Sequence, residues 1–395
     1  MEVRPGYSLT DLGMLPSEWQ VDELGSLDPF VTSGSRGWAT YCADSGAPFI
    51  RITNLSRDSI YIDLTHLKLV DLPPDDREGI RTRLDAGDLL FSITADIGIV
   101  GYVDSRIPRP AYINQHIALV RFDRSKIDTQ FLAYFLAGAN AQRVFRASTD
   151  QGAKAGMNLA GVRKIRAAFP PLPEQCAIAK ALGDVDALLG GLERLITKKR
   201  DLKQAAMQQL LTGQTRLPGF GGQWEVRQLR DICRMKSGEG ITSADIDEYS
   251  PFPCYGGNGL RGYTKRFTHD GDYALIGRQG ALCGNVVLAA GSFFASEHAV
   301  VVTANRQTDI HWLYRVLIRM NLNQYTESTA QPGLSVAKLL LLECPAPSYE
   351  EQTAIGAVLS DMDAELAALE ARRDKTRALK QAMMQELLTG RTRLI

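Results

Sequence analysis

The sequence lacks the features that mark membrane-spanning, exported or disulfide-bonded proteins. No apolar run approaches the roughly 18 residues needed to cross a bilayer, so a membrane-spanning protein is excluded. The first residues contain no apolar stretch behind a basic start, so we expect no export signal and a cytoplasmic location. The six cysteines are scattered and include no Cys-x-x-Cys pair, so we expect neither a disulfide framework nor a zinc site.

Net charge and the common catalytic signatures are missing as well. The 45 Lys and Arg residues balance 45 Asp and Glu residues, so any contact with nucleic acid must depend on local patches. Motifs of phosphate-binding loops, dinucleotide sites, zinc proteases and acyl-transfer nucleophiles are absent. So is the Asn/Asp-Pro-Pro-Tyr/Phe tetrapeptide of amino-methyltransferases. We therefore expect no catalytic residue, no metal and no cofactor in this chain.

The strongest feature that the sequence does contain is an internal repeat. Residues Glu174–Leu217 recur as Glu351–Leu394, with about 26 identities in 44 ungapped positions. A Leu-Pro pair followed by a tryptophan, Trp19 in the first half and Trp224 in the second, precedes each copy. The 395 residues, which are enough for two to three domains, therefore form two similar halves.

Each copy of the repeat is predicted to be a long helix. The copies are expected to start after Pro173 and after Pro347–Ser348, are rich in Ala, Leu, Lys, Gln and Glu, and stop at Gly213 and Gly390, where glycine suits a left-handed cap. About 39 residues would span roughly 58 Å, which is too long for a helix that lies on one small domain. The basic residues Lys198–Arg200 in mid-helix are expected to face solvent or a protein partner.

Heptad spacing of apolar residues predicts that the two helices pair as an antiparallel coiled coil. The alternative is two independent amphipathic surface helices. The positions expected in the seam are Ile178, Leu182, Val185, Leu189, Leu192, Ile196, Ile355, Leu359, Met362, Leu366 and Leu369.

The globular parts between the helices are predicted to be α+β. In each half, short β-type runs such as 89–93 and 273–276 come first, and a helix opens later, near Phe131 and Trp312. The expected segments are a leading segment (1–26), a first globular domain (27–169), a central helix (170–217), a second leading segment (218–230), a second globular domain (231–346) and a final helix (347–395).

Polar loops on these domains carry groups that can bond the edges of bases. Arginine can bond guanine through O6 and N7, and asparagine or glutamine can bond adenine through N6 and N7. The loop Tyr255–Tyr263 interleaves such residues with glycine. Ordinary turns and a solvated surface explain such loops equally well. His116 and His298 occupy matching positions, and we interpret them as polar or structural histidines.

An ordered set of motifs runs along the chain. The motifs are Leu-Pro-x-x-Trp at 15–19, Ser33–Trp38, Phe49–Leu55, Gly87–Phe91, Tyr255–Tyr263, and Pro171–Gln175 leading to a helix that ends at Gln208–Gly213. This ordered set, present twice, resembles the specificity subunits of type I restriction-modification systems over essentially the whole chain. In the second copy, Pro347–Gln352 departs from the Pro-Leu-Pro-Glu-Gln pattern, which should affect only the turn before the helix.

The resemblance implies two target recognition domains, each of which reads one half of a split, asymmetric site in double-stranded DNA. It implies that the paired helices act as a ruler and dock two modification subunits, which supply S-adenosylmethionine and the methyl transfer. Restriction subunits with ATP and Mg²⁺ would complete a nuclease, and no membrane would be involved. This chain would then be non-catalytic and, being uncharged overall, would bind DNA weakly and with steep salt dependence when alone.

Two other classes of protein were weighed against this one. A protein-binding adaptor would use the two domains to hold proteins, and a self-sufficient methyltransferase or nuclease is disfavoured by the missing motifs. A partner system that cuts DNA and one that only methylates it are both compatible with the sequence.

The residues predicted to contact DNA are Arg36, Asn54, Thr94, Gln115 and Lys154 in the first domain, and Tyr255, Asn258, Arg261, Arg278 and Gln279 in the second.

Overall fold

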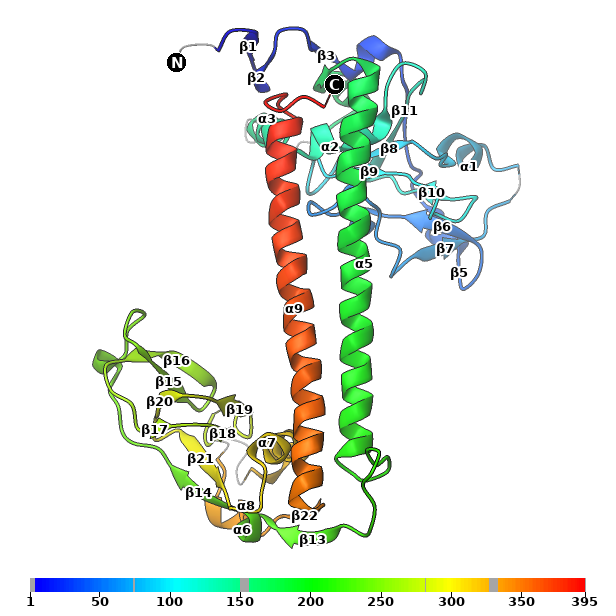
Figure 1. The fold of residues 1–395 in the computed structure, drawn as a ribbon. Coiled ribbons are helices and arrows are strands. Elements are labelled where there is room, and N and C mark those ends of the chain that lie inside the picture. The colour runs from blue at the N-terminus through cyan, green and yellow to red at the C-terminus, as the bar shows by residue number, and fades with distance from the viewer. Residues whose placement is uncertain (1–3, 74, 150–155, 281, 327–332, 395) are drawn as a thin grey trace. The chain divides into compact units, whose positions relative to one another are not determined.

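Two compact units and two long helices make up the computed structural model, which describes residues 4–73, 75–149, 156–280, 282–326 and 333–394. The first unit comprises Met1–Gly191 and Arg373–Ile395, and the second comprises Leu192–Arg372. Figure 1 shows the helices α5 (Leu172–Leu210) and α9 (Tyr349–Leu387), each 39 residues long. Each unit therefore contains one globular domain and one part of each long helix.

The first unit opens with a β-hairpin and continues into two four-stranded sheets. In chain order its elements before α5 are β1 (Tyr7–Thr10), β2 (Gly13–Pro16), β3 (Gln20–Glu23), the 3-10 helix η1 (Leu24–Leu27), β4 (Phe30–Ser33), η2 (Trp38–Tyr41), β5 (Cys42–Ala43), β6 (Ala47–Ile50), η3 (Ile52–Asn54), β7 (Lys68–Val70), α1 (Arg77–Thr82), β8 (Leu89–Ser92), β9 (Val100–Tyr102), β10 (Tyr112–Ile113), β11 (Ile117–Arg121), α2 (Thr129–Ala137), α3 (Ala139–Thr149), α4 (Leu159–Arg163) and β12 (Arg166–Phe169).

The central sheet of this unit, in the order β4-β11-β8-β9, is antiparallel and is covered on both faces. Leu89 and Phe91 face α2 and α5, while Leu90 and Leu119 face the second sheet, β10-β6-β7-β5. Because both faces are buried, the strands read as continuous apolar runs rather than alternating ones. The run predicted at 89–93 is therefore β8, and the helix predicted near Phe131 is α2.

The second unit repeats this plan with its own elements. They are β13 (Glu225–Gln228), α6 (Leu229–Ile232), β14 (Cys233–Ser237), η4 (Ser243–Asp245), β15 (Phe252–Gly256), β16 (Gly259–Thr264), β17 (His269–Asp270), β18 (Tyr273–Gly277), β19 (Val286–Ala289), β20 (Ser292–Ala295), β21 (Ala299–Ala304), α7 (Ile310–Arg319), η5 (Leu322–Tyr325), α8 (Val336–Leu339) and β22 (Glu343–Ala346).

The central sheet of the second unit has the order β14-β21-β18-β19, which matches β4-β11-β8-β9 strand for strand. Ala274 and Ile276 face α7, and Leu275 faces the second sheet, β16-β15-β20-β17. In both second sheets one strand pair is parallel, β6 with β10 and β15 with β20. The duplication seen in the helices therefore extends to the globular domains, although their sequences have little in common.

Each domain is tied to a long helix by the same arrangement of side chains. Asp128 caps α2 by accepting a 2.8 Å hydrogen bond from the Phe131 N–H, and the side chain of Gln175, in α5, accepts one from the Asp128 N–H at 3.0 Å. Asp309 caps α7 in the same way, and Gln352, in α9, accepts from the Asp309 N–H at 3.0 Å. These caps satisfy backbone donors at the helix starts and fix each domain on its helix.

Ion pairs show that α5 and α9 are antiparallel within each unit. In the second unit, Lys199 pairs with Glu365 at 2.6 Å and Arg200 pairs with Glu370. Lys203, farther along α5, pairs with Asp363, earlier on α9. Arg200 is exposed and Lys199 is half-buried, so both charges lie at the helix surface with acidic residues of α9 beside them, and contact of this basic stretch with a partner protein stays a prediction.

Most of the predicted seam positions are buried, but several of them pack into the domain cores rather than only between the helices. Ile178 and Leu182 join the core of the first unit, together with Leu387 at the end of α9. Ile355 and Leu359 join the core of the second unit. Leu189, Leu192, Ile196 and Leu366 are also buried, whereas Val185, Met362 and Leu369 are half-buried.

A half-buried aspartate on each long helix joins both helices to the domain. Asp186 of α5 binds Lys380 of α9 at 2.7 Å and accepts a 2.6 Å hydrogen bond from the hydroxyl of Tyr134 in α2. Burial raises the pKa of Tyr134, so the phenol stays neutral and donates. In the second unit, Asp363 of α9 binds Lys203 of α5 and Arg315 of α7.

An arginine beyond the end of each long helix forms an ion pair with a glutamate at the start of the other, and we call each of these two ion pairs a clasp. Arg216 forms two 2.6 Å hydrogen bonds with the carboxylate of Glu351, and Trp224 donates its indole N–H to the same group. Arg393 holds Glu174 and packs beside Trp19. The tryptophans shared by the two halves therefore belong to these clasps. Within the described ranges, no helix has the length and hydropathy that a membrane span requires.

Candidate nucleic-acid interface

Short loops converge at one end of the central sheet in each unit. We define the first loop cluster as residues 34–36, 93–98 and 114–116, and the second as residues 238–239, 256–258, 278–280 and 296–298. A Cβ atom at Gly34 would lie 2.1 Å from the carbonyl oxygen of Ile113, and one at Gly238 would lie 2.2 Å from that of Ala295. Only glycine allows these loops to approach so closely.

The two clusters share their backbone hydrogen bonds. The N–H of Gly34 donates to Ile117 at 3.3 Å, and that of Gly238 donates to Ala299 at 2.9 Å. A second equivalent pair of hydrogen bonds follows: the N–H of Ile93, just after β8, donates to His116 at 3.0 Å, and the N–H of Arg278, just after β18, donates to His298 at 2.9 Å. The two clusters are therefore one scaffold built twice, on which different side chains are presented.

In the first cluster, the structure brings two of the predicted DNA-contacting residues together around a histidine. The hydroxyl of Thr94 lies 2.6 Å from Nδ1 of His116, and the side-chain nitrogen of Gln115 lies 3.1 Å from Nε2 of the same ring. Arg36 is exposed in the neighbouring loop. Asp96, in the loop after β8, is held by Arg57, whose hydrogen bonds lower the pKa of that carboxyl group.

Asn54 is placed inside the first unit and away from the loop cluster. Its side chain is 2% exposed, accepts from the N–H of Arg51 at 3.0 Å and donates to the carbonyl of Asp63 at 3.0 Å. These bonds use the groups that would read adenine, so the placement gives Asn54 a structural part instead of the predicted one. Lys154 lies outside the described residues.

In the second domain, three of the predicted residues lie in the loop cluster, and a fourth lies on the adjoining strand β16. Asn258 and Gln279 are exposed at the tips of the β15–β16 and β18–β19 connections, and Arg261 is exposed on β16. Arg278 is half-buried and donates to the hydroxyl of Ser237 at 3.1 Å. This loop surface therefore offers amides and guanidinium groups, the donors and acceptors used for base edges and phosphates.

Tyr255 is placed differently from the other predicted residues of the second domain. It is half-buried on β15, with its ring 5.7 Å from that of Phe293. Burial raises the pKa of Tyr255, so its hydroxyl remains protonated at neutral pH. The ring packs against the second sheet of this unit and helps to support the strand.

Two polar residues of the second cluster were not predicted to contact DNA. Glu297 and His298 form the turn before β21, where Oε1 of Glu297 lies 3.2 Å from Nε2 of His298. The sequence does contain a signal that could have pointed to Glu297, since Ser296–His298 is similar to Asn114–His116. That similarity was interpreted for the two histidines alone.

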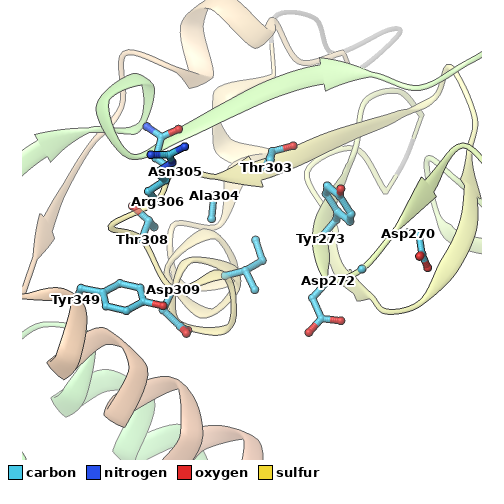
Figure 2. Close-up of a pocket in the computed structure, with 12 residues that line it drawn as sticks. Asp270, Asp272, Tyr273, Thr303, Ala304, Asn305, Arg306, Thr308, Asp309 and Tyr349 are labelled. Carbon is cyan, nitrogen blue, oxygen red and sulfur yellow. The ribbon is translucent and has the colours of Figure 1, made fainter.

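The pocket in Figure 2 lies at the opposite end of β18 from the second loop cluster. It has a volume of about 360 Å³, is open and polar, and is lined by Asp270, Asp272 and Asp309 with Arg306. Asp309 is already used as the cap of α7, and Asp272 pairs with His311 at 3.3 Å. This acidic lining disfavours phosphates, so the candidate interface is the loop cluster. In the part of the chain that the structure describes, no group of acidic, His and Cys residues is arranged to hold a metal ion.

Two stretches of the chain, residues 16–199 and 222–377, match the family described as the type I restriction modification DNA specificity domain. The chain belongs to this family. Its match occurs twice, once for each globular domain, so the internal repeat is a duplication of the DNA specificity domain.

Relatives by sequence carry the same family description. The chain is 48% identical to the EcoprrI type I restriction enzyme specificity subunit of Escherichia coli over 141 residues. This matched stretch is 35% of each protein. Over 426 residues it is 24% identical to a Methanocaldococcus jannaschii protein assigned as the MjaX type I restriction enzyme specificity subunit, which covers 98% of this chain and 97% of the relative.

Solved structures of specificity subunits share the fold. The S subunit of a type I restriction-modification system from M. genitalium superimposes with a TM-score of 0.69 over 98% of both chains, at 16% identity. A chain from a structure of type I R-M complex assembly gives a TM-score of 0.50 over 96% of this chain and 99% of its own, at 17% identity.

These findings confirm three expectations drawn from the sequence. The chain belongs to the type I restriction-modification specificity family, the family's DNA specificity domain occurs in it twice, and its fold is a duplicated α+β domain with long helices. The assignments of individual residues to DNA stay predictions.

Proposed function

We propose that each loop cluster reads one half of a split, asymmetric DNA site and that the chain itself performs no chemical step. The observation that carries this proposal is the duplicated scaffold, because equivalent loops present Thr94 and Gln115 in one unit and Gln279 and Glu297 in the other. Different side chains at equivalent positions suit two different half-sites. Specific contact would come from these side chains, and register would come from phosphate contacts of neighbouring arginines.

The long helices would set the gap between the half-sites and dock the partner subunits. Both helices have residues in each compact unit, so the units are joined by helix rather than only by loops. We propose that two modification subunits bind these helices and supply S-adenosylmethionine and methyl transfer, and that restriction subunits supply ATP- and Mg²⁺-dependent cleavage. This chain would hold none of these cofactors.

Co-expression of the full chain with the modification subunit of its own operon tests the proposal. Methylated adenines in the host genome are then mapped by single-molecule sequencing, with the modification subunit alone as the control. We expect a split motif with a fixed gap that depends on this chain. A protein-binding adaptor would be favoured instead if the complex were stable but methylated no DNA, and if it bound a specific duplex and a random duplex equally well.

A further inference from the structure

Gln115 in the first unit and Glu297 in the second occupy the same position of the shared scaffold. Each residue comes immediately before a histidine. The backbone carbonyl of that histidine accepts a hydrogen bond in both units, from the Ile93 N–H to His116 at 3.0 Å and from the Arg278 N–H to His298 at 2.9 Å. The turns are closed alike, since Asn114 accepts from the His116 N–H and Ser296 accepts from the His298 N–H.

In both turns the histidine ring holds one polar atom of the residue before it. Nε2 of His116 lies 3.1 Å from the amide nitrogen of Gln115, and Nε2 of His298 lies 3.2 Å from Oε1 of Glu297. The ring orients the side chain through that atom, while the Gln115 amide keeps its oxygen and its second N–H for a ligand. Oε2 of Glu297 is buried and has no hydrogen-bond partner among the described residues, so the carboxylate has an unsatisfied acceptor.

A structural role explains the Glu297–His298 pair poorly. The two side chains are 41% and 45% exposed, and such exposed polar contacts contribute little to stability. A carboxylate beside a DNA phosphate backbone is also unfavourable unless a base supplies a donor to it. The pair is therefore better explained by a ligand group that donates a hydrogen bond to the carboxylate.

We propose that Gln115 and Glu297 are the equivalent specificity-determining residues of the two domains, and that His116 and His298 position them. This inference rests on the proposed function. Glutamine presents a donor and an acceptor, which match N7 and N6 of adenine. Glutamate presents acceptors only, which suit the N4 amino group of cytosine and repel the O6 and N7 acceptors of guanine and the O4 acceptor of thymine. Gln115 therefore selects adenine in one half-site, and Glu297 selects cytosine in the other.

A reciprocal exchange tests the assignment in the full complex with the modification subunit. For Glu297→Gln we expect the methylation motif to change at one position of one half-site, where a C·G pair gives way to A·T or becomes degenerate, with a change in preference on the order of tenfold. For Gln115→Glu we expect the opposite change in the other half-site. Glu225→Gln removes the same charge from an exposed position on β13 and should leave the motif intact.

A positioning role for the histidine is tested separately. His298→Ala should weaken discrimination at the base pair that Glu297→Gln alters and at no other. His298→Gln, whose amide can still donate to the Glu297 carboxylate, should restore much of it. A histidine that merely stabilises the turn would instead affect all positions of that half-site alike.

Three results separate this inference from the function on which it rests. If the wild-type chain yields no split motif, the proposed function fails. If the wild-type motif is present but neither exchange alters it, or if both half-sites weaken alike, the assignment of Gln115 and Glu297 is overturned. If a variant complex methylates no DNA, its binding is measured by competition among duplexes that carry each base pair in turn at each position of the site. A changed preference at one position supports the assignment, and a uniform loss of affinity at all positions refutes it.

Discussion

At the scale of single residues, the loop clusters combine fixed glycines with exchangeable polar side chains. Gly34 and Gly238 are held against backbone in both units, whereas the residue before the histidine is Gln115 in one and Glu297 in the other. The glycines define where the loops lie, and the polar residues define what the loops can bond.

Replacing one of these glycines should damage one half-site only. In Gly238→Ala the new methyl group would meet the carbonyl oxygen of Ala295 at 2.2 Å, so the loops of the second cluster must move apart. We expect methylation mapping of the complex to show loss of discrimination in the half-site that the second domain reads. Gly34→Ala should do the same in the other half-site.

Gly240→Ala is the matched control for this pair. A Cβ atom at Gly240 has no atom within 4 Å, so the motif should be unchanged. Equal loss in both half-sites after Gly238→Ala would show that the substitution disturbs assembly rather than the second loop cluster.

Single-residue roles were the least predictable part of the molecule. The sequence predicts a polar loop at Tyr255–Tyr263, whereas the structure forms most of it into β15 and β16, with Asn258 exposed at their turn and Arg261 exposed on β16. The sequence could not show that Asn54 bonds the backbone at Asp63, because that contact depends on how separate segments pack. Glu297 was overlooked because an isolated glutamate carries no motif until the two turns are superimposed.

At the scale of elements, the long helices were predictable because caps and composition act locally. Gly213 and Gly390 adopt the left-handed conformation, with φ of 71° and 65°, as expected of residues that end helices. The helix α5 begins at Leu172, before Pro173, because proline fits the first turn, where its missing N–H has no partner to lose. The two- and three-residue strands β5, β7 and β10 were not predicted, since they depend on pairing between distant segments.

A glycine in the middle of α5 should be replaceable with a gain in stability. Gly191 lies within the helix, and a Cβ atom there would have no atom within 4 Å. Gly191→Ala should therefore raise the free energy of unfolding by about 0.5 to 1 kcal/mol, because alanine loses less backbone entropy in a helix. Chemical denaturation followed by circular dichroism measures the change.

Gly356 of α9 is the contrasting position on the other long helix. A Cβ atom there would lie 2.7 Å from Oδ1 of Asp309, the cap of α7. Gly356→Ala should lower stability although the helix propensity rises. A gain in stability at Gly356, or a loss at Gly191, would contradict the packing described for these helices.

At the scale of the whole molecule, the two clasps use the end of one repeat to complete the start of the other. Glu174 is fully buried and is held by Arg393, near the last residue, while Glu351 is held by Arg216. Hydrogen bonds to the glutamates raise the pKa of both arginines, which stay charged. The first unit therefore needs the final residues of the chain to compensate a buried carboxylate.

Loss of the terminal clasp should destabilise the first unit and spare the second. Arg393→Ala leaves Glu174 buried without its cation, which should cost about 3 kcal/mol. Hydrogen exchange measured by mass spectrometry should show faster exchange near the start of α5, while Arg216→Ala should affect the second unit. Arg391→Ala, at an exposed pair with Glu386, should change stability by less than about 0.5 kcal/mol.

The turn before each histidine has a consequence in genetic terms. Glutamine and glutamate codons differ by a single nucleotide in the first position, so one point mutation at Gln115 or Glu297 converts either residue into the other. The glycines around these turns admit no such change without displacing the loops. On the proposed assignment, one nucleotide substitution at either position would therefore give a new recognition sequence on an intact scaffold.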